Sequence, residues 1–216
     1  FKKIEEKIIE SENVSDFNMA VRKLNETLNN NTLDQEKCFY ILRVLEKLVP
    51  VMKEKFHSPE AKRILYVLFD IGVTACCHIG DSKGAEKYFE KCKQYAGLVS
   101  LDDYLSTRNK LVVSYCDYFE VARAEKLSDE NMRFQERLTG FKKELELPGV
   151  GDNGFEAMGK AHSQRGQVYA FKRDRRAEVE FRAALVHFEE ASANYKMTQS
   201  YLLQYYLCLL YTSPSP

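Results

Sequence analysis

Two short segments within residues 155–191 place small and aromatic side chains at helical spacing, and a short polar turn joins them. The apolar positions are Ala161, Gly166, Tyr169 and Ala170 in the first segment, and Ala177, Phe181, Ala184, Leu185 and Phe188 in the second. A small side chain lets a neighbouring helix approach closely, and an aromatic ring can fill the space beside it. The pattern therefore predicts a helical hairpin that buries its faces against further helices.

The rest of the chain has the same helical periodicity, with recognisable starts and ends. Ser58 and Pro59 are typical of a helix start, because a serine hydroxyl can cap the helix and proline suits its first position. Gly80 followed by Asp81 is typical of a helix end and of the cap of the next helix. The chain therefore consists mainly of helices joined by short turns.

Other boundaries rest on single residue types. Pro50 has no backbone N–H, so we expect it to kink or break its helix. Apolar spacing predicts one long helix over 101–124, and Ser128 predicts the start of the next helix. With these breaks, the 216 residues predict an all-α fold of about nine to ten helices in stacked antiparallel hairpins.

Residues 147–154 contain one Pro and three Gly, which predicts a loop or hinge. This loop would separate the N-terminal hairpins of residues 1–146 from a C-terminal hairpin and a following helix in residues 155–207. Its glycines also have the G-x-G-x-x-G spacing of a dinucleotide-binding loop. That motif needs a preceding strand, whereas a charged helical segment precedes these glycines, so we interpret the segment as a linker.

The last nine residues, 208–216, resemble the translation of a sequencing adapter. A natural Ser/Pro tail is the alternative interpretation. The chain also begins at Phe1 without an initiator methionine. We therefore expect a metagenomic fragment of a larger microbial protein, with a non-native tail over 208–216.

Charge and hydropathy exclude several classes of partner. The 32 basic and 32 acidic residues give no net charge, so we expect no nucleic-acid partner. No apolar run is long enough to span a bilayer, so we expect no membrane association. The six cysteines lie mostly in apolar helical stripes and form no C-x-x-C pair, which favours reduced thiols in a cytoplasmic protein.

The sequence shows no convergent set of reactive side chains. The four histidines have no spacing that would bring three metal ligands together, and His78 points away from Cys76 and Cys77 on a helix. The basic run 172–176 could bind phosphates, but it lies on the expected polar turn, where solvated charges are ordinary. We therefore expect no catalytic residues, no metal, no cofactor and no enzymatic activity.

Two segments share a motif in which an acidic turn residue precedes a small, an aromatic and a second small residue. The matching positions are Asp81, Ala85, Phe89 and Cys92 in one segment, and Asp174, Ala177, Phe181 and Ala184 in the other. This motif resembles the second helix of a tetratricopeptide repeat (TPR), and Gly166 and Tyr169 match that family's first helix. The family's Trp and closing Pro are absent, and Cys76 stands where the family has Tyr.

The resemblance implies a TPR-like α-solenoid whose concave face binds a peptide or a partner protein. The residues it would place on that face are Lys160, Gln164, Gln167 and Phe171 in the last hairpin, and Asn109 and Tyr118 in the central helices. We therefore expect a protein-interaction scaffold, with solvated or packing side chains as the plainer interpretation of these residues. The alternative function is the sensor or regulatory arm of a multidomain bacterial signalling, transcription or defence protein.

Overall fold

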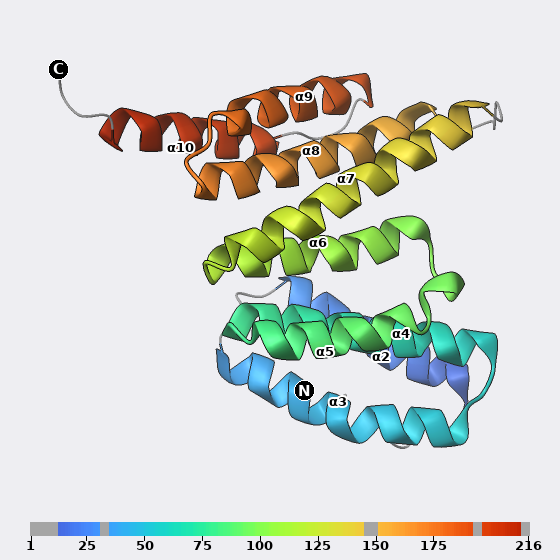
Figure 1. Cartoon of the computed structure of the whole chain (residues 1–216). Helices are drawn as coiled ribbons and strands as arrows, with labels where there is room; N and C mark the ends of the chain where they lie inside the picture. Colours follow the sequence, from blue (N-terminus) through green and yellow to red (C-terminus); the bar gives the residue numbers. More distant parts are fainter. Residues whose placement is uncertain (1–12, 31–34, 145–150, 192–195, 213–216) are drawn as a thin grey trace. The chain divides into compact units, whose positions relative to one another are not determined.

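The computed structural model describes residues 13–30, 35–144, 151–191 and 196–212. These ranges form nine α-helices and one short 3-10 helix, and they contain no strand (Figure 1). The predicted all-α fold is therefore confirmed. The chain divides into two compact units, Phe1–Ser114 and Tyr115–Pro216.

The first unit is built around α4 (Pro59–Ile79), which packs against helices on several sides. These neighbours are α2 (Val14–Asn30), α3 (Gln35–Lys55), α5 (Ser82–Lys93) and the 3-10 helix η1 (Ala96–Leu98). The predicted start of α4 is confirmed, because the Ser58 hydroxyl accepts a hydrogen bond from the Ala61 N–H at 3.1 Å. Eleven of its residues are buried, as its nearly continuous apolar sequence requires.

A polar network holds α6 (Leu101–Asp117) against α4. The Asp70 carboxylate accepts hydrogen bonds from Thr107 Oγ1 at 2.8 Å and from Lys110 Nζ at 2.6 and 2.8 Å. The Tyr66 hydroxyl lies 2.7 Å from Thr107 Oγ1. Because these groups satisfy one another, α6 can pack on α4 without leaving them unpaired in the interior.

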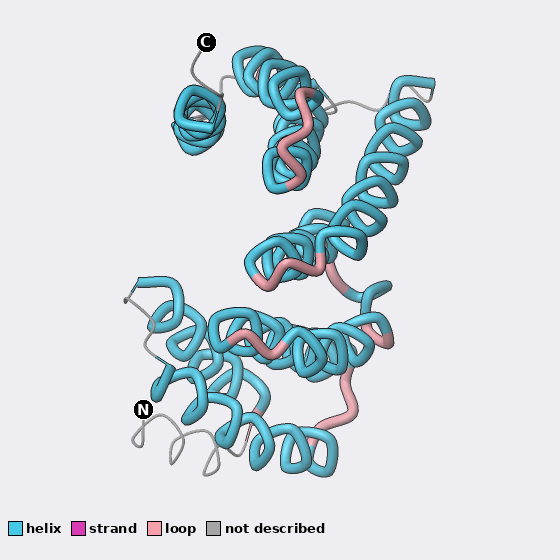
Figure 2. The backbone as a smooth tube through the Cα atoms, turned by 60° about the vertical axis from the view of Figure 1, so that its left-hand side comes forward, coloured by secondary structure: helices cyan, strands magenta, loops and turns pink. Residues whose placement is uncertain are grey.

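The second unit contains α7 (Val121–Glu144), α8 (Gly151–Phe171), α9 (Arg176–Glu190) and α10 (Lys196–Thr212). Figures 1 and 2 show α8 and α9 side by side, joined by a short turn. Phe181 of α9 lies against Gly166 of α8, where an added Cβ would come within 2.7 Å of two carbons of the Phe181 ring. Tyr201 and Tyr205 of α10 cover the same ring. The small and aromatic pattern of this segment thus allows three helices to pack closely.

The three helix-to-helix turns at Gly80, Phe119 and Arg173 have the same backbone geometry. Each of these residues is left-handed, with φ of 80°, 60° and 55° respectively. In each turn the following acidic residue donates its N–H to the carbonyl five residues earlier, at 3.0, 2.7 and 2.9 Å. This is the Schellman arrangement, which satisfies the free carbonyls at the end of a helix.

Three predictions about helix boundaries differ from the structure. The helix expected over 101–124 ends at Asp117, because the turn at Phe119 reverses the chain, and Ser128 lies buried inside α7 rather than at its start. Pro50 does not break α3, which continues from Gln35 to Lys55. Pro50 is exposed, so water can reach the backbone carbonyl that it leaves without a donor.

The expected hinge differs from the structure in two respects. The second half of 147–154 is helical, because α8 begins at Gly151, and 147–150 lie outside the described residues. The boundary between the compact units falls between Ser114 and Tyr115. The expected tail at 208–216 begins inside α10, which continues to Thr212.

Candidate interaction surface

The predicted partner-binding residues of α8 differ in their accessibility. Lys160 is exposed and forms an ion pair of 2.6 Å with Glu156 on the same helix. Phe171 is 46% exposed at the end of α8, and Gln167 is half-buried. Gln164 is only 6% exposed, so it packs inside the unit and its place on an accessible wall is corrected. Three of the four residues can therefore meet a partner.

The two candidates from the central part of the chain also differ. Asn109 is half-buried in α6. Tyr118 lies beyond the end of α6, in the turn, and is 42% exposed. The residues assigned to repeat packing all lie buried: Ala85, Phe89, Cys92, Gly166, Tyr169, Ala177, Phe181 and Ala184. Both central candidates can therefore reach solvent, and Tyr118 is the more exposed of the two.

Several exposed aromatic side chains were not among the predicted site residues. Phe119 is 83% exposed at the tip of the turn between α6 and α7. Phe134 and Phe155 are also exposed. Spacing could not identify Phe119, because the pattern continued through the turn as if the helix were unbroken.

An ion pair connects the start of α7 to the end of α8. Lys172 Nζ lies 2.7 Å from Glu125 Oε2. Figure 1 shows these two helix ends at the same end of the second unit. The turn from α6 to α7 and the turn from α8 to α9 are therefore neighbours.

The turn from α8 to α9 is rigidified by its own charges. The Arg176 guanidinium donates two hydrogen bonds, from Nε and Nη2, to the Oδ2 oxygen of Asp174, and it lies over the Tyr169 ring, 4.2 Å from its centroid. The hydrogen bonds from Arg176 lower the pKa of Asp174 to about 2. The Asp174 carboxylate also accepts from the backbone N–H of Arg176, which caps the start of α9. These contacts assign Asp174 and Arg176 to holding the turn.

A cluster of charged side chains lies between α8 and α9. His162 Nδ1 is 2.8 Å from Glu180 Oε2, and Arg165 Nε is 3.4 Å from the other carboxylate oxygen. The His162 ring stacks on His187 at a centroid distance of 5.3 Å. Burial, and then the neighbouring His162, lower the pKa of His187. This cluster therefore favours a neutral His187 in the folded protein.

The arrangement of histidines does not form a metal site. Nowhere in the described ranges do three or more His, Cys, Asp or Glu side chains gather closely enough to hold a metal ion. Five cysteines, Cys38, Cys76, Cys77, Cys92 and Cys116, form no disulfide, and burial raises the pKa of Cys76 to about 12 and that of Cys116 to about 12. Thiols of such high pKa are poor nucleophiles at neutral pH.

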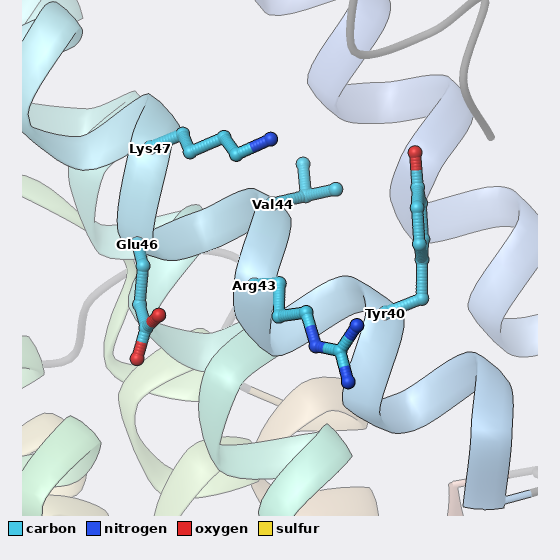
Figure 3. Close-up of a pocket in the computed structure, with 5 residues that line it drawn as sticks. All are labelled: Tyr40, Arg43, Val44, Glu46 and Lys47. Atoms are coloured by element: carbon cyan, nitrogen blue, oxygen red, sulfur yellow. The ribbon is translucent and has the colours of Figure 1, made fainter.

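A surface pocket of about 360 Å³ lies on α3, lined by Tyr40, Arg43, Val44, Glu46 and Lys47. Figure 3 shows these side chains spread along the helix, with the Glu46 carboxylate and the Lys47 ammonium pointing away from each other. Because the charged groups do not converge, these five residues offer neither an acid–base pair nor a set of metal ligands. The exposed side chains of the second unit are therefore the better candidate surface.

Comparisons with protein-family models, with curated proteins and with solved structures found no match to this chain. In the part of the chain that the structure describes, no helix combines the length and the apolar character needed to cross a membrane.

Proposed function

We propose that this chain is a TPR-like solenoid segment that acts as a protein-interaction scaffold. The observation that carries the proposal is the exposure of large aromatic side chains in the second unit, namely Tyr118, Phe119, Phe134, Phe155 and Phe171. Exposed aromatic residues on a well-packed helical frame are typical of protein-binding surfaces. A peptide or a partner protein that covers these rings would remove them from water.

The packing of the hairpins supports the solenoid part of the proposal. Gly72 faces the Tyr88 ring across the turn at Gly80, as Gly166 faces Phe181 across the turn at Arg173. The same small-against-aromatic contact thus recurs in two hairpins, one in each unit. These hairpins are separated in the chain by α6 and α7, and recurrence of one packing contact in more than one hairpin is typical of a helical repeat protein.

Selection from a display library of randomised short peptides tests the binding function. We expect the immobilised 216-residue chain to enrich peptides, and we expect Phe171→Ala to weaken their binding about tenfold, because an exposed aromatic anchor is lost. Phe39→Ala, which removes an exposed ring from the first unit, is the matched control and should bind as the wild type does. A library that shows no enrichment on the folded chain would refute the proposed function.

A further inference from the structure

The turns at Phe119 and Arg173 form one surface of the second unit, which includes three of the exposed aromatic residues named above. We name it the turn surface and define it by Tyr118, Phe119, Phe171, Arg173 and Arg175. The ion pair of Lys172 with Glu125 holds the two turns together within the second unit. All five residues of the turn surface are exposed. The surface therefore combines three aromatic rings with two guanidinium groups.

The conformation of Phe119 indicates that its aromatic side chain does not stabilise the fold. Its φ of 60° is left-handed, a region that bulky side chains rarely adopt and that glycine adopts freely. Gly80 occupies the same position in the equivalent turn of the first unit. Because Phe119 is 83% exposed, burial of its ring in the chain does not compensate for this conformation. A ring held outward at such a position is suited to contact another molecule.

The charges around the turns leave two cations available. Glu120 pairs with Arg123 at 2.7 Å, Glu125 with Lys172 at 2.7 Å and Asp174 with Arg176 at 2.6 Å. Arg173 and Arg175 are exposed and make no ion pair with any residue that the structure describes. The acids of the two turns thus have partners, whereas these two arginines can bind carboxylates of another molecule. Arginine is well matched to carboxylate by its planar fork of donors.

We propose that the turn surface binds an acidic peptide segment that also carries an aromatic or large aliphatic side chain. The carboxylates would pair with Arg173 and Arg175, and the apolar side chain would pack on Phe119 and Phe171. A polyanion fits less well, because the chain has no net charge and the surface has only these two available arginines among its described residues. This inference rests on the proposed function and specifies its site and the chemistry of its partner.

The peptide selection described above tests the inference when its products are sequenced and their affinities are measured on the full chain. We expect enriched peptides to contain Asp or Glu together with Phe, Trp or Leu, and to bind more weakly as salt rises. Phe119→Gly should lower their affinity about tenfold or more, and because glycine suits the left-handed turn, this variant should stay folded. The double variant Arg173→Glu/Arg175→Glu should lower affinity about tenfold or more.

The control Arg133→Glu/Arg137→Glu changes the net charge equally at exposed positions of α7, and it should bind as the wild type does. Peptides without acidic residues, or peptides that bind the turn variants as tightly as the wild type, would overturn this inference and leave the proposed function intact. A selection that enriches no peptide would overturn both this inference and the proposed function. Tighter binding of single-stranded oligothymidine or of phosphatidylglycerol vesicles than of any peptide, with loss in the Arg173/Arg175 variant, would assign the surface to another class of ligand and would also overturn the inference.

Discussion

Replacement of Gly166 by Ala should destabilise the second unit, although alanine is the better helix former. A Cβ at this position would lie 2.7 Å from the Cδ1 and Cε1 carbons of Phe181, which is well inside van der Waals contact. The ring cannot easily move away, because it is 1% exposed and Tyr201 stacks on it at 6.4 Å. Overpacking of this kind costs up to about 3 kcal/mol.

The magnitude follows from two opposing effects. Alanine stabilises a helix interior by about 1 kcal/mol relative to glycine. The steric cost of about 3 kcal/mol exceeds this gain, so Gly166→Ala should lower the free energy of unfolding by about 2 kcal/mol. In a Phe181→Leu background the ring is absent, so the same substitution should stabilise the protein by about 1 kcal/mol. The coupling energy of the pair should therefore be about 3 kcal/mol.

Urea unfolding monitored by far-ultraviolet circular dichroism measures all four proteins of this cycle. Gly97→Ala is the matched control, because nothing lies within 4 Å of a Cβ at that position, and it should change stability by less than about 0.5 kcal/mol. If Gly166→Ala stabilises the wild-type chain, or if its effect is the same with and without the Phe181 ring, the close packing of α8 on α9 is refuted.

Three further predictions concern stability. Burial lowers the folded-state pKa of His187, so the stability of the protein should be full above about pH 6.5 and should fall as the pH drops below that value towards the folded-state pKa. Thermal unfolding across this pH range should show a smaller loss of stability in His187→Gln than in the wild type. Because both positions are left-handed, Gly80→Ala should lower the free energy of unfolding by about 1–2 kcal/mol, and Phe119→Gly should raise it by about 1 kcal/mol. Changes of the same sign in urea unfolding would contradict this. Asp70→Ala should cost about 2–3 kcal/mol, since Thr107 and Lys110 lose their shared acceptor, and a change below about 0.5 kcal/mol in the same assay would show that the network does not stabilise the fold.

Residue types with a direct backbone role made much of the fold predictable. Gly80 and Asp81 marked a turn because glycine adopts positive φ and aspartate caps a helix, and the structure has both features. The small and aromatic positions were identifiable because helical spacing places them on one face. Ala177 and Phe181 are indeed buried. These signals are local, so one sequence is enough to contain them.

The turn at Phe119 could not be predicted for the converse reason. Its geometry depends on hydrogen bonds from two backbone N–H groups to the carbonyls of Tyr115 and Cys116, which any residue type can form. No glycine or asparagine marks the left-handed position. Gln164 failed as a surface residue because polarity does not reveal which helix covers it. The turn surface could therefore not be predicted from the sequence, because it depends on the contact between the two turns, where Lys172 pairs with Glu125.

Heteronuclear NMR spectra of the labelled full chain, recorded during titration with the tightest selected peptide, test the binding account most directly. The account predicts that amide signals of Tyr118 and Phe119, and of 171–175, shift in proportion to peptide bound. It also predicts that signals from the α3 pocket around Arg43 stay unchanged. Shifts centred on that pocket, or a bound peptide that leaves both turns unperturbed, would contradict it.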